Sequence, residues 1–112
     1  MRVALLNPPE DYPIPDGVEQ FDLPATSLDF IHLFAARLAE LETVFPELKA
    51  ALAPAGMLWI SWYKKSAKIP TDLDENLIRE IGLVGGLVDV KVAAVDDLWS
   101  GLKFVYRLKD RA

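Results

Sequence analysis

Two apolar strands separated by one amphipathic helix constrain the fold of this chain more than any other feature. Leu28–Phe34 and Met57–Tyr63 are apolar runs of strand length. Between them, apolar side chains recur every three or four residues and share one helix face: Leu38, Leu41, Phe45, Leu48 and Leu52. Pro46 should kink or divide this helix, because it removes one hydrogen bond of the ladder. The order strand, helix, strand predicts a crossover between parallel strands.

Further elements extend this pattern in both directions. Arg2–Asn7 is a buried strand, Val18–Leu23 is a short strand, and a second helix runs over Leu73–Val84 until Gly85-Gly86 stops it. Asp72 should cap this helix and Glu75 should complete the capping box. The last strands are Val88–Val95 and Leu102–Leu108. Their connection, Asp96–Gly101, is too short for a parallel crossover and predicts an antiparallel pair.

These elements predict a single α/β domain over residues 1–112, with a mostly parallel sheet of five or six strands and an antiparallel C-terminal hairpin. The formal net charge of −5 argues against binding of nucleic acid, which needs a clustered positive surface. Cysteine is absent, which excludes disulfides and thiolate chemistry. No secretory signal is recognisable, and every apolar run is too short to span a membrane, so we expect a cytoplasmic protein.

The segment Leu48–Ile60, in which a helix ends in Leu-Ala-Pro-Ala-Gly and enters a buried strand, resembles the C-terminal half of class I S-adenosylmethionine-dependent methyltransferases. The closing hairpin is similar to the terminal hairpin of that fold. The resemblance covers roughly residues 28–108 and implies a truncated, Rossmann-like methyltransferase fold. Asn7-Pro8-Pro9-Glu10 stands where that family has its glycine-rich cofactor loop, and Glu19 is the nearest counterpart of its ribose-binding acid. The resemblance therefore implies the fold without the cofactor, and we expect no tight binding of S-adenosylmethionine.

A second resemblance spans nearly the whole chain. It is carried by four segments, Arg2–Asn7, Lys64–Asp72, Gly86–Lys91 and Trp99–Lys103. They resemble a family of short bacterial proteins that form a domain of unknown function. This resemblance implies no activity.

The loop between the strand Met57–Tyr63 and the second helix is the predicted ligand site. Ligands of open α/β sheets bind beyond the carboxyl ends of the strands, and a helix N-terminus beside lysines suits an anion. The residues that would form this site are Lys64, Lys65, Ser66, Lys68 and Thr71. The alternative is an ordinary solvated loop whose lysines pair with Asp72, Asp74 and Glu75.

Other polar residues favour structural roles. His32 is the only histidine, it lacks recognisable co-ligands for a metal, and we interpret it as a partly buried residue that is hydrogen-bonded through one ring nitrogen. Asp96 and Asp97 have an alternative reading as an acid/base pair, but neighbours in a turn usually point apart. We therefore predict no catalytic residue, no metal site and no cofactor.

Large aromatic residues should fill the core. Trp59 and Trp62 fall on opposite faces of their strand, so one of them should be a core residue. Trp99 is expected to stabilise the fold, and Gly101 is expected to end a turn with a positive φ angle.

Two functional hypotheses of different classes remain. The first is a non-catalytic domain, either an interaction module or a small-anion or other ligand binder. The second is a degenerate transferase-like enzyme that acts on an anionic small molecule. We also expect a homodimer, because the residues between Asn7 and Leu28 show no helical period and leave part of one sheet face without cover.

Overall fold

The computed structural model describes residues 1–14 and 16–110. They form one six-stranded sheet in the order β2-β1-β3-β4-β6-β5. The strands are β1 (Arg2–Leu6), β2 (Glu19–Gln20), β3 (Leu28–Phe34), β4 (Leu52–Tyr63), β5 (Leu87–Ala94) and β6 (Trp99–Tyr106). β1 to β4 pair in parallel, whereas β6 runs antiparallel to both β4 and β5. The predicted mixed sheet with an antiparallel C-terminal hairpin is confirmed.

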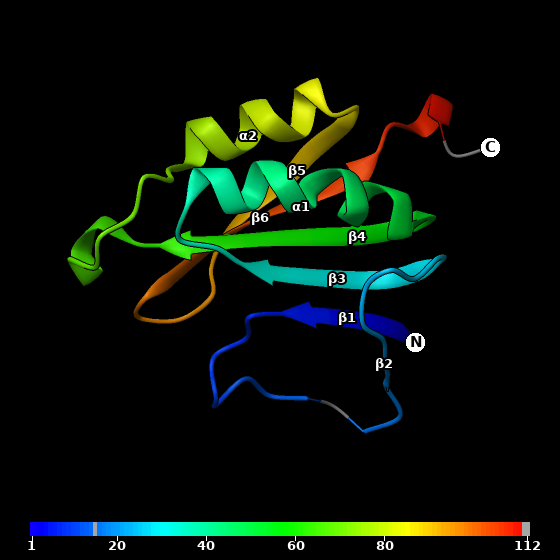
Figure 1. Ribbon diagram of the computed structural model, residues 1–112, viewed down its shortest axis with the longest axis horizontal. Coiled ribbons are helices and arrows are strands. Elements are labelled where there is room, and N and C mark those ends of the chain that lie inside the picture. The colour runs from blue at the N-terminus through cyan, green and yellow to red at the C-terminus, as the bar shows by residue number, and fades with distance from the viewer. Residues whose placement is uncertain (15, 111–112) are drawn as a thin grey trace.

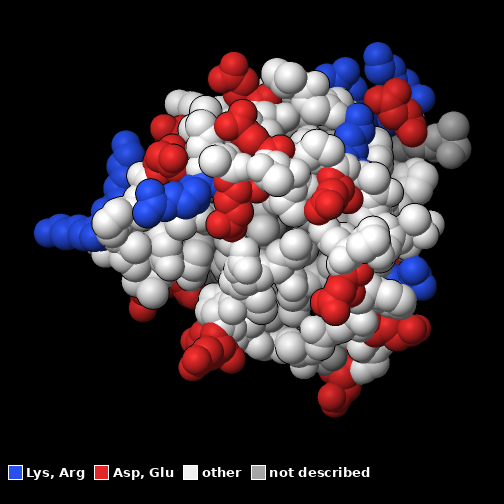
Figure 2. Space-filling view, viewed as in Figure 1, with Lys and Arg blue, Asp and Glu red and all other residues white. Residues whose placement is uncertain are grey.

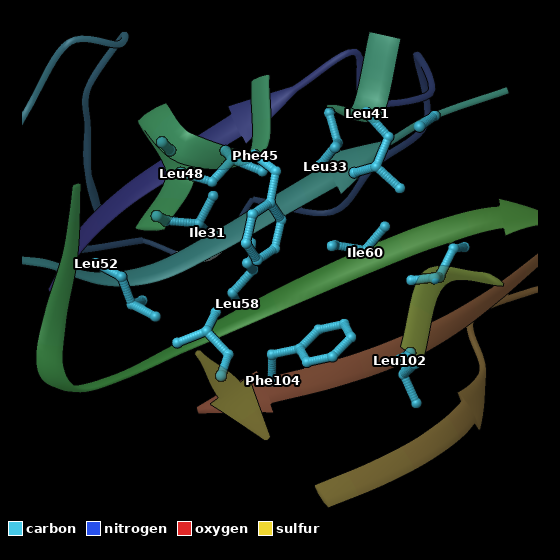
Figure 3. Close-up of a cluster of buried hydrophobic side chains, with 14 of the residues drawn as sticks. Ile31, Leu33, Leu41, Phe45, Leu48, Leu52, Leu58, Ile60, Leu102 and Phe104 are labelled. Carbon is cyan, nitrogen blue, oxygen red and sulfur yellow. The ribbon is translucent and has the colours of Figure 1, made fainter. Parts of the chain in front are cut away.

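Two α-helices, α1 (Leu38–Ala51) and α2 (Glu75–Val84), cover the same face of this sheet (Figure 1). The core lies between them and the sheet, where apolar side chains of α1 meet those of β3, β4 and β6 (Figure 3). The fully buried members include Ile31, Leu33, Leu41, Leu48, Leu58, Ile60, Ile78, Leu102 and Phe104. Burial of each such side chain contributes about 1.5–3 kcal/mol, which makes this layer the main source of stability.

The helix α1 runs without interruption past Pro46, so the prediction that this proline divides the helix is wrong. Pro46 is exposed, and it lies on the solvent side of the helix, where water can bond the carbonyl group that loses its partner. On the opposite side Leu41, Phe45 and Leu48 are buried against the sheet. Their packing outweighs the cost of the proline.

The strand β4 begins at Leu52, directly after α1, and not at Met57. Leu52 pairs with Leu28 of β3, and the register then shifts before Phe30 pairs with Met57. Gly56 permits this irregularity, because a Cβ atom there would lie 2.7 Å from the carbonyl oxygen of Leu28. The Pro-Ala-Gly segment that appeared to be a connection is therefore part of a bulged strand.

The second helix begins at Glu75, and its N-cap is Asp74 instead of Asp72. Asp74 Oδ1 accepts a hydrogen bond from the backbone N–H of Leu77 at 2.8 Å. Asp72 has a different role: its Oδ1 accepts a 2.7 Å hydrogen bond from the backbone N–H of Leu38, in the first turn of α1. Asp72 and Asp74 thus supply hydrogen-bond acceptors for backbone N–H groups in the first turns of both helices.

The final hairpin is tighter than the sequence predicts, since β5 ends at Ala94 and β6 begins at Trp99. Gly101 therefore lies inside β6, and it is absent from the described glycines with positive φ, so the predicted turn role is wrong. A Cβ atom there would lie 3.0–3.3 Å from Val95, Trp59 and Ser61, so a larger residue would require these side chains to shift. The pairing of β5 with β6 also shifts register between Asp89 and Lys91, so Val90 has no paired residue in β6.

The opposite face of the sheet is covered by neither α-helix. The β1–β2 connection (residues 7–18) forms no helix in its described residues. Tyr12 of this connection lies on the uncovered face, where its ring contacts His32. Half-buried side chains remain on the face, among them Met57, Trp59, Val88 and Val105. In the described part of the chain, no helix is long and apolar enough to cross a membrane.

Candidate functional site

The lysine loop (residues 64–71) lies at the carboxyl end of β4, as predicted. Lys64 continues from the strand, and its backbone N–H donates to the carbonyl oxygen of Leu98 at 2.8 Å. Residues Lys65–Ala67 then form the short 3₁₀ helix η1. Basic side chains gather over η1 at one end of the molecule (Figure 2). The loop is thus anchored at its start by the β5–β6 hairpin.

Among the described residues, the lysines of this loop have no ion-pair partner. Within the described residues the only salt bridges join Arg79 to Glu75 and to Asp89. The nearby acidic side chains, Asp72 and Asp74, are used as helix caps. The described residues therefore lack the ion pairs of the alternative, in which the lysines would pair with Asp72, Asp74 and Glu75.

The polar side chains of the loop differ in their availability. Ser66 is exposed, together with Lys65 and Lys68, whereas Lys64 is half-buried. The Thr71 hydroxyl donates to the carbonyl oxygen of Ala36 at 2.7 Å and accepts from the backbone N–H of Leu73 at 3.1 Å. Thr71 thus holds the loop against the start of α1, and its oxygen has little capacity left for a ligand.

The loop borders a concavity of about 500 Å³ at the edge of the sheet. Its walls carry charges of both signs, since Lys64, Lys65 and Lys68 face Asp72 and Asp74 across it. An anion that binds here must lie near the lysines and away from the two capping carboxylates.

At the end of β1, where a cofactor loop would stand, the side chain of Asn7 forms a hydrogen-bonded bridge. Asn7 adopts a φ angle of 56°, a conformation that asparagine tolerates better than most residues. Its side-chain Nδ2 donates to Glu40 Oε1 at 3.1 Å and, at a longer 3.4 Å, to the carbonyl oxygen of Phe34. The side chain of Asn7 thereby bridges the ends of β1 and β3.

His32 is buried on the face that lacks helices, and both of its ring nitrogens have partners. Nε2 lies 2.7 Å from Ser61 Oγ, and Nδ1 lies 3.0 Å from the hydroxyl of Tyr12. The expectation of a hydrogen bond through one nitrogen is therefore wrong. Burial lowers the pKa of His32 from its ordinary value of 6.5 to about 4, so the ring is neutral at pH 7.

A histidine beside a serine hydroxyl has the composition of a base and a nucleophile. Ser61 is nevertheless fully buried, at 0% exposure, and a substrate cannot reach its oxygen. Sequence reasoning missed both partners of His32. The signal for Ser61 was the strand pairing, because His32 lies beside Trp59 and Ser61 is the next residue on that face.

The remaining residues with predicted roles have structural surroundings. Asp96 Oδ1 accepts hydrogen bonds from the backbone N–H groups of Leu98 and Trp99, so it shapes the hairpin turn. Trp99 is buried, with 9% exposure, and its ring stacks on Tyr63 at 4.0 Å. Trp62 is buried in the core, whereas Trp59 is half-buried on the other face. The described residues contain no group of three or more metal-ligating side chains.

Comparison with known proteins shows the fold. No family model and no curated protein matches the chain. Among solved structures it is similar to magnesium protoporphyrin IX methyltransferase from Synechocystis with bound SAH, at 13% identity and a TM-score of 0.59, covering 80% of this chain and 51% of that one. It is also similar to a TehB-like SAM-dependent methyltransferase from Corynebacterium glutamicum (12% identity, TM-score 0.56, 80% and 56% covered).

A SAM-dependent methyltransferase from Aquifex aeolicus is a further neighbour, at 20% identity and a TM-score of 0.52, with 80% of this chain and 55% of that one covered. The chain thus spans about half the length of these three enzymes. At these identities the likeness establishes architecture alone. The chain has a small, truncated form of the Rossmann-like methyltransferase fold.

Proposed function

We propose that this chain is a non-catalytic ligand-binding domain, and that its lysine loop binds a small anion. The observation that carries the proposal is the gathering of three lysines at the carboxyl end of β4, where none of them pairs with a described carboxylate. Among the described basic side chains only Arg79 forms salt bridges, so what distinguishes this loop is that three lysines lie on it together. Three ammonium groups on one short loop attract phosphate or carboxylate oxygens, as point charges with several donors each.

The test is a titration of the amide resonances of residues 64–76 with inorganic phosphate, sulfate and a nucleotide at low salt. We expect saturable shifts confined to this segment, and we expect them to vanish in the double variant Lys64→Ala, Lys65→Ala. The control variant Lys91→Ala, Lys109→Ala removes the same charge from exposed positions elsewhere. Shifts that persist in the first variant, or that spread over the whole surface, contradict the proposal.

The second candidate is a transferase-like enzyme that acts on an anionic small molecule. What favours it is the fold, since the neighbours described above are methyltransferases and one of them was solved with bound SAH. The bridge from Asn7 to Phe34 and Glu40, and the prolines that follow it, oppose close approach of a cofactor to the end of β1. Calorimetric titration with S-adenosylmethionine distinguishes the two candidates: micromolar affinity favours the enzyme, and its absence favours the binding domain.

The proposal includes the partners and setting of the domain. A second copy of the chain is the proposed cover for the sheet face that lacks helices, because mostly parallel sheets are normally buried on both faces. We further propose a cytoplasmic protein that belongs with the short bacterial proteins whose segments it shares. Self-association is tested below.

A further inference from the structure

A second pocket lies on the face opposite the helices, between the β1–β2 connection and the β5–β6 hairpin. Its volume is about 310 Å³, which suits a small organic molecule. His32 and Phe34 of β3 belong to its lining, together with Asp11 and Tyr12 on one side and Val95 and Asp96 on the other. It shares no residue with the concavity beside the lysine loop.

The strand order gives this pocket its significance. From β1 the sheet extends to β2 on one side and to β3 on the other, so the chain reverses direction across the sheet at the β1/β3 boundary. Ligands of open α/β sheets bind beside such reversal points, at the carboxyl ends of the strands. Pro9, two residues beyond Asn7, and Phe34 at the end of β3 both line the pocket, which places it at this point.

The lining has a consistent chemical character. The rings of Tyr12 and Phe34 meet edge to face at 5.6 Å, and Phe34 stacks on His32 at 4.2 Å. Asp11 and Asp96 are both exposed and add negative charge on opposite sides. The lining residues include no lysine or arginine, and the imidazole that they surround is neutral at pH 7. The pocket is therefore aromatic and apolar within and acidic at its edges.

We propose that this pocket binds a small organic cation, namely an ammonium group carried on an apolar or aromatic body. The carboxylates of Asp11 and Asp96 attract the ammonium group, and the face of an aromatic ring such as that of Tyr12 adds a cation–π contribution. The apolar body of the ligand packs against Phe34 and Val95. An anion is excluded by the same two carboxylates, so this ligand differs in charge from the one proposed for the lysine loop.

The probes are benzylammonium and benzyl alcohol, which share a ring and differ in charge. The side-chain resonances of Tyr12 and His32 report occupancy of the pocket. We expect benzylammonium to bind about tenfold more tightly than benzyl alcohol at low salt, since two carboxylates at partly solvated distances supply roughly this factor. Added salt should reduce the difference.

The variant that tests the assignment is Asp11→Asn, Asp96→Asn. Asparagine keeps a side-chain oxygen that can accept the turn hydrogen bonds of Asp96, while the charge is lost. We expect the two probes to bind this variant equally. The control Asp22→Asn, Asp97→Asn removes the same charge outside the pocket and should keep the tenfold preference. If the double variant fails to fold, Asp11→Asn alone should still weaken the preference.

Equal binding of both probes to the unaltered protein would overturn the proposal, as would a preference that survives the charge-removing variant. Benzylammonium binding should be unaffected by Lys64→Ala with Lys65→Ala. The test of the cation pocket can therefore succeed or fail independently of the test of the lysine loop.

Discussion

At the residue scale, the least expected feature is a neutral histidine enclosed by a tyrosine and a serine from distant parts of the chain. Tyr12 belongs to the β1–β2 connection, His32 to β3 and Ser61 to β4, so one imidazole ties three segments together. A neutral ring can donate from one nitrogen and accept at the other, and both partners can reciprocate. Protonation of the ring removes its acceptor and places a charge in a buried site.

The stability of the protein should therefore depend on the titration of His32. Its pKa is about 4 in the folded chain and 6.5 in the unfolded chain, so the unfolded chain binds more protons between these values. The contribution of neutral His32 to the free energy of unfolding should be complete above pH 6.5. It should decrease by about 3 kcal/mol as the pH falls from 6.5 through 4. Denaturant unfolding from pH 4 to 7.5, compared with His32→Gln, isolates this contribution. A constant difference between the two profiles would contradict it.

Trp99 gives a second prediction at this scale. Its ring is buried against Tyr63 and Phe34, at 4.0 and 4.9 Å between ring centroids. Replacement by alanine leaves a cavity and should lower the free energy of unfolding by about 3–5 kcal/mol. The neighbouring variant Leu98→Ala is the control, because Leu98 is 45% exposed and should change stability little. Urea denaturation measures both, and equal effects would mean that Trp99 is not a core residue in solution.

At the element scale, the segment after the lysine loop organises both helices. Asp72 bonds the N-terminus of α1, Asp74 caps α2, and Thr71 bonds the carbonyl group that precedes α1. The helices were predictable from the apolar periodicity of their residues, the strand β3 from its apolar run, and the antiparallel hairpin from its short connection. The assignment of caps was not, since Asp72 acts on a residue 34 positions away and sequence patterns report local partners. The contacts of His32 escaped prediction for the same reason.

The caps can be tested individually. Asp74→Ala and Asp72→Ala should each lower the free energy of unfolding by about 1 kcal/mol, the usual cost of losing an N-cap. Asp97→Ala, an exposed aspartate outside both helices, should have a much smaller effect. Thermal melts compared at one pH provide the measurement. Full stability in Asp72→Ala would show that its hydrogen bond to Leu38 contributes nothing.

At the scale of the whole molecule, the described α-helices cover only one of the two faces of the sheet. The two α-helices and the sheet are present, and the layer that would cover the other face is reduced to the β1–β2 connection. The chain spans about half the length of the methyltransferases it is similar to. What remains uncovered is a surface made by half-buried apolar side chains.

We expect this surface to associate with its counterpart in a second molecule. Light scattering at high micromolar concentration should report a dimer, and Val105→Asp, on the uncovered face, should convert it to a monomer. Val84→Asp is the matched control, because Val84 is 83% exposed on α2 and lies away from this face. A monomer in the unaltered protein, or a dimer that only Val84→Asp disrupts, would contradict this prediction.

The register shift in β5 decides how such association can proceed. β5 is the outer strand of the sheet, with backbone groups open on one side, and a regular strand in that place would accept a further strand from another molecule. The extra residue at Val90 interrupts the spacing of those groups, and a strand that approaches finds no continuous ladder to extend. Growth from edge to edge through β5 should therefore be disfavoured. Contact through the uncovered face is complete once one partner covers it, so the chain should form closed pairs and resist assembly into fibrils.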